Sequence, residues 1–244
     1  MNHSTRRLGT WISSGSPVIT ELAALSGFDW VLFDLEHGNG TEADLPNQLR
    51  GLKGTSSRGI VRVGAPREDT IARYLDWGAH GIMVPHVHSA VAAEKIVRAA
   101  YYPPRGARGF SRSVRAYDYG MNAVTPETFK PLLIAQIETG EGVHAAKEIA
   151  CVDGIDVLFI GPADLQLDLR VRPQSAPGSY EDCLGLVSEA ARTAGKAAGI
   201  LLRDLSDLQK HLTLGFEYIA VDSDLSLLRK GFHQINQALP VPSP

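Results

Sequence analysis

Several polar side chains that could carry out chemistry directly follow apolar stretches of the sequence. One stretch leads into Asp34, Glu36 and His37, and two others lead to Glu138 and Asp164. Carboxylates are suitable oxygen ligands for a hard divalent cation such as Mg²⁺, and an imidazole exchanges a proton near neutral pH. If the apolar stretches are strands of a parallel barrel, their carboxyl ends meet on one face. The pattern therefore predicts a site built on that face.

Glu138 and Asp164 are the candidates for metal binding, because Mg²⁺ usually takes one or two protein carboxylates and leaves its other positions to water and substrate. Asp164 also lies near the expected start of a short helix, whose free N–H groups can hold a substrate carboxylate. Arg62 lies within an apolar stretch, where a charge is costly unless it faces an anion. Its fork of donors suits an enolate or keto-acid oxygen. The alternatives are capping of strand ends by the two acids, an ion pair across the barrel for Arg62, and a structural role for His37.

The stretches that position these residues alternate with longer amphipathic ones, which is typical of repeated βα units. We expect strands at Leu8–Ile12, Trp30–Asp34, Gly59–Val63, Gly81–Val84, Leu132–Ile137, Val157–Ile160, Ala198–Leu202 and Tyr218–Val221. We expect helices at Ser16–Ser26, Glu42–Lys53, Glu68–Trp77, Ala90–Ala99, Gly142–Ile149, Tyr180–Ala194, Leu205–Leu214 and Asp224–Ala238. Eight such units predict an α/β fold, the (β/α)8 or TIM barrel.

The chain is expected to form one domain, residues 1–244, because its length suits a single barrel and no linker or short repeat interrupts it. A doubly wound open sheet is the competing architecture. It usually needs a glycine-rich first turn for a nucleotide, and Gly9-Thr10-Trp11 is not such a turn. Tyr101–Thr125 is too long for a plain turn and predicts an elaborated loop. Residues 239–244 are expected to be a flexible tail.

The composition is that of an ordinary soluble enzyme, with 44% hydrophobic and 21% charged residues. A formal net charge of -3 provides no basic field that would favour nucleic acid or an anionic membrane. No uninterrupted apolar segment approaches the roughly 20 residues needed to span a bilayer. The two cysteines, Cys151 and Cys183, form no CxxC motif, so we expect a reducing, cytoplasmic environment.

Further segments match, in order and spacing, the motifs of one known family. They are Gly27-Phe-Asp-Trp-Val-Leu-Phe-Asp-Leu-Glu-His37, Val61-Arg-Val63, Leu75-Asp-Trp-Gly-Ala79, Met83-Val-Pro85, Tyr102-Pro-Pro-Arg-Gly-Ala-Arg-Gly109, Gln136-Ile-Glu138 and Phe159-Ile-Gly-Pro-Ala-Asp-Leu165. Through them the chain resembles the HpcH/HpaI family of class II, metal-dependent 2-oxo-acid aldolases over nearly its whole length. The resemblance implies a TIM barrel that forms a homohexamer, a trimer of dimers, with the last helix exchanged between neighbouring subunits.

The resemblance also implies an activity and roles for individual residues. The reaction would be reversible aldol cleavage of a 4-hydroxy-2-oxo acid to pyruvate and an aldehyde, with a metal rather than a lysine Schiff base as the electron sink. Glu138 and Asp164 would ligate Mg²⁺, Mn²⁺ or Co²⁺. Arg62 would stabilise the enolate, and His37, oriented by Asp76, would handle the proton.

The remaining roles concern the loop and the pocket. Asp34 would support the loop that carries His37. The substrate pocket would be lined by Arg62, Gln136, Gly161, Pro162, Ala163 and Asp164.

The chain departs from the family pattern in two places. Gln166 and Arg170 follow Asp164 where the family commonly has a serine and then a glycine, so the loop near the metal is expected to differ. His86 and His88 stand where apolar or amide residues are expected, and should alter the aldehyde end of the pocket. The competing functions are a citrate-forming condensing enzyme or CoA-ester lyase with the same enolate chemistry, and a catalytically weakened 2-oxo-acid-binding protein.

Overall fold

The strands form a closed parallel barrel in the computed structural model, which describes residues 7–122 and 125–238. In chain order they are β1 (Arg7–Ile12), β2 (Trp30–Asp34), β3 (Arg58–Arg62), β4 (Gly81–Val84), β5 (Leu132–Ile137), β6 (Val157–Ile160), β7 (Ala197–Leu202) and β8 (Phe216–Ser223). Each strand pairs with the next in parallel, and β8 closes the barrel on β1. The predicted TIM barrel is confirmed, and every strand lies within two residues of its predicted bounds.

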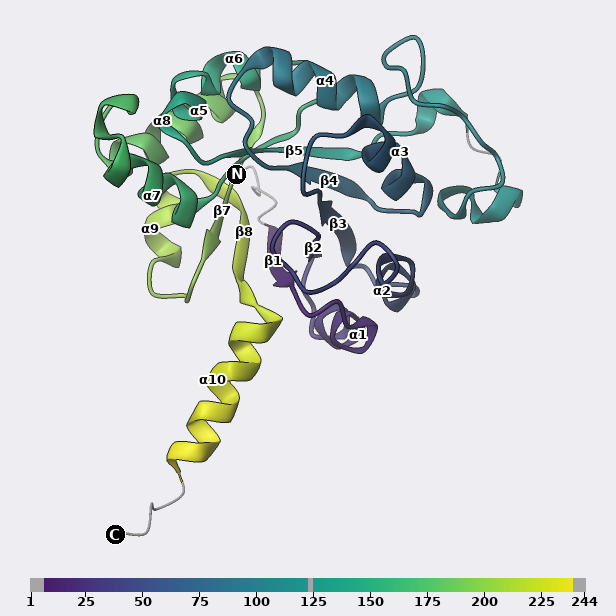
Figure 1. Ribbon diagram of the computed structural model, residues 1–244, viewed down its shortest axis with the longest axis horizontal. Helices are drawn as coiled ribbons and strands as arrows, with labels where there is room; N and C mark the ends of the chain where they lie inside the picture. Colours follow the sequence, from purple (N-terminus) through teal and green to yellow (C-terminus); the bar gives the residue numbers. More distant parts are fainter. Residues whose placement is uncertain (1–6, 123–124, 239–244) are drawn as a thin grey trace, which may run out of the picture.

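Helices return the chain along the outside of this barrel, with the exception of the last helix (Figure 1). They are α1 (Pro17–Leu25), α2 (Leu45–Gly51), α3 (Glu68–Asp76), α4 (Ala90–Ala100), α5 (Gly140–His144), α6 (Ala146–Ala150), α7 (Pro162–Val171), α8 (Tyr180–Thr193), α9 (Leu208–Thr213) and α10 (Asp224–Gln237). Short 3₁₀ turns are η1 (Arg115–Gly120), η2 (Pro126–Thr128) and η3 (Pro173–Ser175). The single helix predicted at Gly142–Ile149 is instead the pair α5 and α6, which meet at Ala145.

Strand residues alternate between two apolar layers, as the two-residue period of a strand requires. Leu32, Ile60 and Ile134 pack in one cluster together with Trp30 and Phe159, in the interior of the barrel. Their neighbours along the strands belong to the larger cluster between the barrel wall and the helices. The residue two places after each interior residue must therefore also face inward, one layer nearer the carboxyl ends of the strands.

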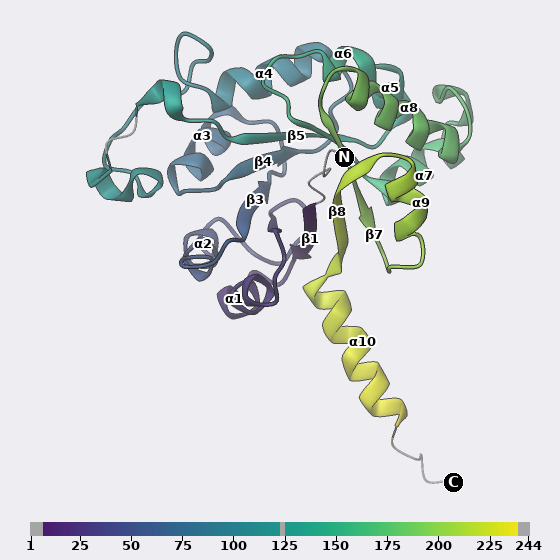
Figure 2. The same cartoon turned by 180° about the vertical axis from the view of Figure 1, so that it is seen from behind.

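The last helix, α10, extends away from the barrel instead of lying against it (Figures 1 and 2). Asp224, its first residue, is its only buried one. The apolar side chains of Leu228, Phe232 and Ile235 are 40%, 67% and 67% exposed. Helix α1 also leaves an apolar surface open, since Leu22 is 60% exposed. Two unpartnered apolar surfaces therefore lie near the junction of α10 with the barrel. None of the helices among the described residues is both long and apolar enough to cross a membrane.

The predicted tail at residues 239–244 lies outside the described residues. The elaborated loop predicted after the fourth helix connects α4 to β5 and contains η1 and η2. It lies at the amino-terminal end of the strands, because α4 ends there and β5 begins there.

Candidate active site

The alternation along the strands places Asp34, Arg62 and Gln136 in the interior layer nearest the carboxyl end of the barrel. Asp34 and Arg62 are also register partners on the adjacent strands β2 and β3. Their side chains form a two-pronged ion pair, with Arg62 Nε 2.9 Å from Asp34 Oδ1 and Nη2 2.8 Å from Oδ2. Both side chains are buried, at 8% and 4% exposure. The site thus begins as a geometric consequence of two apolar strands that each end in a charged residue.

Asp34 also holds the loop that follows β2. Its Oδ1 accepts hydrogen bonds from the backbone N–H groups of Glu36, at 3.1 Å, and of His37, at 3.2 Å. A carboxylate that accepts bonds from the next residues of its own chain fixes a tight turn. The turn therefore sets the positions of the Glu36 and His37 side chains.

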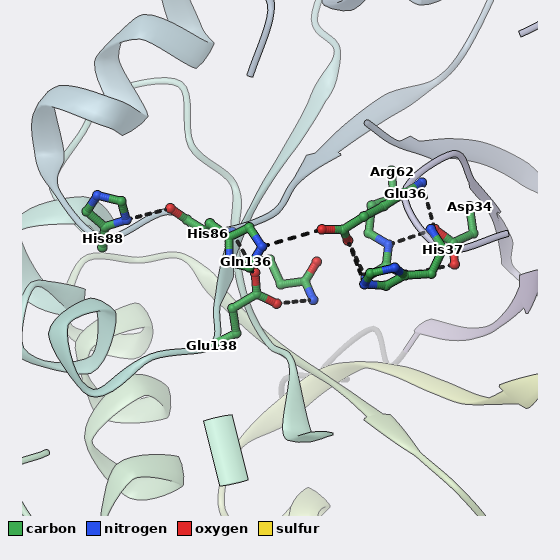
Figure 3. A network of polar contacts seen from close by, with 8 residues as sticks. All are labelled: Asp34, Glu36, His37, Arg62, His86, His88, Gln136 and Glu138. Carbon is green, nitrogen blue, oxygen red and sulfur yellow. Dashed lines mark hydrogen bonds and ion pairs between the residues drawn. The ribbon is translucent and has the colours of Figure 1, made fainter. Parts of the chain in front are cut away.

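Glu36 stands between the charged groups of the site (Figure 3). Its Oε2 lies 2.8 Å from Arg62 Nη1 and 3.9 Å from His37 Nε2, whereas its Oε1 lies 3.5 Å from His86 Nε2. The His37 side chain is 68% exposed at the mouth of the site, and that of Glu36 is only 10% exposed. A single, largely enclosed carboxylate therefore lies between the arginine and both histidines.

Glu138, one residue past β5, is the most enclosed acid of the group, with a side chain only 1% exposed. Its Oε1 accepts a hydrogen bond from the backbone N–H of His86 at 2.6 Å and lies 2.8 Å from the Nδ1 of the same residue. Its Oε2 accepts from Gln136 Nε2 at 2.7 Å. Burial raises the pKa of Glu138, and the nearby Asp164 raises it further, while His86 opposes the shift. A cation beside Glu138 would relieve this burial cost.

Asp164 lies in the first turn of α7, so it faces the site from the next strand along. It lines a cavity of about 450 Å³ together with Arg62, Gln136 and Gly161, and a neighbouring one together with Glu138 and His86. Glycine is required at position 161, because a Cβ there would lie 2.7 Å from Glu138 Oε2. Gln136 Oε1 is buried and has no hydrogen-bond partner among the described residues. This orphaned oxygen and the two carboxylates fit an oxygen-liganded divalent cation with its substrate.

Asp76 lies near the end of its helix, as predicted, but apart from His37 of the same chain. It is the last residue of α3, and a helix that returns from the carboxyl end of β3 must end near the amino end of β4. There the Asp76 carboxylate forms an ion pair with Nη2 of Arg108, and the Arg108 side chain is fully buried. His37 lies at the other end of the barrel, so within one chain the predicted contact between Asp76 and His37 is wrong. The βα order by itself places the end of each returning helix at the amino end of the barrel, so the predicted elements already separate Asp76 from His37 within one chain.

The cavity also includes residues that the sequence reasoning missed. Arg203 directly follows β7, and Asp222 and Ser223 end β8. Arg203 could have been found, because a charged residue follows an apolar strand there just as it does after β2. Of the two unusual histidines, His86 contacts Glu138, and the ring of His88 bonds to the backbone oxygen of His86 at 2.7 Å. Gln166 and Arg170 are both exposed on α7.

The closed barrel and its acid-lined carboxyl end define a TIM-barrel enzyme whose active face gathers carboxylates, an arginine and two histidines. A sequence model of the family described as HpcH/HpaI aldolase/citrate lyase matches residues 7–231, and the chain belongs to this family. The protein is accordingly a carbon–carbon lyase of the aldolase type.

Named relatives agree with this placement. The chain is 35% identical over 237 residues to a hydroxypyruvate/pyruvate aldolase from Paraburkholderia phytofirmans, covering 94% of this chain and 91% of the relative. It is 33% identical to a 5-keto-4-deoxy-D-glucarate aldolase from Klebsiella pneumoniae, with 95% and 91% covered. A crystal structure of a family member from Burkholderia cenocepacia superposes with a TM-score of 0.90 at 31% identity, covering 97% of this chain and 95% of that one.

Proposed function

We propose that the protein catalyses the reversible, divalent-metal-dependent aldol cleavage of 4-hydroxy-2-oxo acids to pyruvate and an aldehyde. The observation that carries this proposal is the cavity lined by Arg62, Gln136, Gly161 and Asp164, which adjoins a second cavity lined by Asp164 and the buried Glu138. Relatives named as pyruvate and 5-keto-4-deoxy-D-glucarate aldolases support the same chemistry.

Glu138 and Asp164 are the residues that would hold the cation. Two carboxylates on neighbouring strand ends suit Mg²⁺, Mn²⁺ or Co²⁺, and oxygen ligands alone discriminate weakly among these metals. When bound, such a cation supplies a Lewis acid that polarises the 2-oxo group and accepts electron density as the carbon–carbon bond breaks. The Nδ1 atom of His86 lies 2.8 Å from Glu138 Oε1, beside the position that the cation would take.

The protein's own groups bind the substrate and move its proton. The first turn of α7 offers the backbone N–H groups of Ala163 and Asp164 to the substrate carboxylate, beside Gly161 and the N–H-free Pro162. Arg62 is held by Asp34 and has further N–H groups for the developing enolate oxygen. 

His37 is suited to the proton transfer. Its ring is exposed to the cavity on a turn that Asp34 fixes. In cleavage, His37 accepts the proton of the 4-hydroxyl group while the bond between C3 and C4 breaks and the aldehyde carbonyl forms. The electron pair passes to the 2-oxo oxygen, and protonation of the enolate at C3 yields pyruvate.

Coupled assays of pyruvate release from 4-hydroxy-2-oxo acids test this function directly. We expect activity that is lost with EDTA and restored by Mg²⁺, Mn²⁺ or Co²⁺. Glu138→Gln, Asp164→Asn and His37→Ala should each reduce kcat strongly, while Glu141→Gln, an exposed acid in α5, serves as the matched control. Full activity after thorough chelation would exclude the metal role, and wild-type turnover in the Glu138 and Asp164 variants would exclude the metal-site assignment.

The proposal includes self-association into a homohexamer through exchange of α10. The apolar side chains of Leu227, Leu228, Phe232 and Ile235 line a cavity with those of α1, and no other part of the described chain covers this surface. The α10 of a second copy is the occupant that matches it. We expect Phe232→Glu to lower the mass measured by sedimentation velocity, and Arg229→Glu on the same helix to leave it unchanged. Assembly also matters for Asp76, which can reach a His37 ring only on another subunit.

A citrate-forming reaction is the second candidate. A crystal structure of a citrate synthase superposes with a TM-score of 0.82 at 28% identity, covering 97% of this chain and 94% of that one. Assays with acyl-CoA donors and with oxo-acid acceptors separate this reaction, or a CoA-ester lyase, from an aldolase. Binding of pyruvate without turnover of any acceptor would instead identify a catalytically weakened 2-oxo-acid-binding protein.

A further inference from the structure

Arg203 is a second arginine in the wall of the cavity, and its environment differs from that of Arg62. The Arg62 guanidinium is buried between Asp34 and Glu36, so its charge is compensated by two carboxylates. Arg203 follows β7, lines the same cavity and is exposed. Within residues 7–122 and 125–238, no hydrogen bond or ion pair engages its guanidinium, and only its backbone oxygen is bonded. Its charge is therefore available to an anion that enters the cavity.

Asp222, an acid that lines the same cavity, is already paired with another cation. Lys230 of α10 donates to Asp222 Oδ2 at 2.6 Å, and the backbone N–H of Ser223 donates to Oδ1 at 3.0 Å. Burial acts to raise the pKa of Asp222, but the bonds from Lys230 and its neighbours outweigh it and keep that pKa below its usual range. Asp222 therefore stays ionised and paired, and it does not cancel the charge of Arg203.

Lys230 also fixes the backbone at Arg203. The same ammonium group donates to the Arg203 backbone oxygen at 3.1 Å, which ties the end of β7 to the end of β8. The Asp222 backbone has a φ of 56°, an uncommon conformation for a residue other than glycine, so the ion pair is held in an otherwise unfavourable local geometry. Lys230 thus links Arg203 to Asp222 and leaves the Arg203 guanidinium without a carboxylate partner among the described residues.

The position of Arg203 indicates which part of a substrate it contacts. The carboxylate and 2-oxo group are assigned to the β5 and β6 side, where Glu138 and Asp164 lie. The cavity of about 450 Å³ extends from there to the ends of β7 and β8, beyond the space that the six heavy atoms of pyruvate need. The aldehyde half of the substrate therefore has room beside Arg203.

We propose that Arg203 binds a second anionic group at the far end of the aldehyde, so that the substrates are 4-hydroxy-2-oxo acids with an acidic end group. This inference rests on the proposed aldolase function. A guanidinium group binds a carboxylate or a phosphate through paired hydrogen bonds, and the two anions share this chemistry. Arg203 acts on specificity and takes no part in bond cleavage.

Matched aldehydes test the proposal in the condensation direction with pyruvate. Succinic semialdehyde and butanal have the same chain length and differ in the terminal carboxylate, and glyceraldehyde 3-phosphate with glyceraldehyde gives the phosphate comparison. We expect the wild-type enzyme to have a higher kcat/KM for one charged aldehyde than for its neutral partner. The pair that shows this preference identifies the anion. Arg203→Met should reduce that kcat/KM about 10- to 100-fold, the usual effect of losing a charge-assisted hydrogen bond. The neutral aldehyde should change less than about twofold.

Two further variants keep the test decisive. Arg203→Lys keeps the charge without the fork and should retain part of the preference, which covers the case in which Arg203→Met does not fold. Arg192→Met, which removes an exposed arginine from α8, is the matched control. Equal losses for charged and neutral aldehydes, or no loss for either, would overturn the role of Arg203.

Exchange of the pyruvate methyl protons in D₂O, followed by NMR, separates this inference from the proposed function. Enolate formation needs no aldehyde, so exchange should be as fast in Arg203→Met as in the wild type. Absence of exchange in the metal-loaded wild-type protein would overturn the aldolase proposal itself. Normal exchange combined with indifference to the charge of the aldehyde would overturn only the assignment of Arg203.

Discussion

Replacement of Arg62 by methionine is the most informative single perturbation of this protein. Methionine is also unbranched and replaces the aliphatic part of the side chain, but it removes every bond to Asp34 and the 2.8 Å contact with Glu36. With Arg62 in place, the side chains of Asp34 and Glu36 are only 4% and 10% exposed. The variant therefore buries two carboxylates without their shared cation.

The size of the effect follows from this burial. Removing one partner of a buried ion pair costs about 3–5 kcal/mol, mostly because the remaining charge is left uncompensated. For a chain of this length, about 2–4 °C of Tm is lost per kcal/mol, so Tm should fall by roughly 6–20 °C. Arg62→Lys retains the charge but not the two-pronged geometry, so it should fall between the wild type and Arg62→Met.

The chain offers a matched control for this experiment. Arg67 forms the same two-pronged pair with Asp69, at 3.2 and 2.9 Å, but the two side chains are 67% and 53% exposed. Because solvent screens an exposed pair, Arg67→Met should leave stability unchanged within error. The two variants share the two-pronged geometry and differ in burial and in the additional contact of Arg62 with Glu36.

Urea unfolding followed by circular dichroism, at neutral pH without added metal, gives the free energies. The double variant Asp34→Asn with Arg62→Met should recover part of the loss, because the amide carries no charge, and the cycle yields their coupling energy. Aldol activity of folded Arg62→Met should be almost absent at 25 °C. A stability loss below about 1 kcal/mol, as small as that of Arg67→Met, would refute the view that burial makes this pair indispensable.

Two further predictions concern the barrel wall. Gly9→Ala should destabilise the protein by about 1–3 kcal/mol, because the new Cβ would lie 2.2 Å from the packed Trp30 ring. The Cβ of Gly185→Ala in α8 meets no atom within 4 Å, so this variant should stabilise the protein by roughly 1 kcal/mol. Equal Tm values for the two variants would contradict this reasoning. Folding lowers the pKa of Asp222, so its ionised carboxylate stabilises the folded protein above about pH 4. This stabilisation is lost as the pH falls through the pKa that Asp222 has in the folded state. Lys230→Met should therefore lower the free energy of unfolding by about 1–2 kcal/mol at pH 7. In urea unfolding measured over a pH series, acid unfolding of this variant should begin at a higher pH than in the wild type. An unchanged pH profile would exclude the ion pair as the cause of the stability loss.

The sequence supports prediction of the fold more fully than of the site. All eight strands are predictable because strands covered on both faces are near-continuous apolar runs, which is a local property. The split of one helix into α5 and α6 depends on the bend at Ala145, and no glycine or proline marks that position. The charged strand ends at Asp34, Glu138 and Asp164 are also visible locally. Arg203 also follows an apolar strand, but it lies outside the segments that match the family motifs.

The tertiary structure decides which charged side chains contact one another, because the two members of each pair come from segments far apart in the chain. Arg108 is the partner of Asp76 because a returning helix ends at the opposite face of the barrel from His37. His86 contacts Glu138 because β4 and β5 are neighbours and the backbone at His86 has a φ of 55°, which no local pattern announces.

What the sequence determines by itself is the inventory of this protein: eight βα units, and acids, an arginine and a histidine at strand ends. Period-two alternation and the shared direction of parallel strands are enough to bring these groups to one face. Only the closed barrel decides which acid compensates which cation, which charge remains free in the cavity, and that α10 leaves its apolar side uncovered. The physical reason is that burial and charge pairing depend on distances across the barrel, which are set by closure and not by any local stretch of residues.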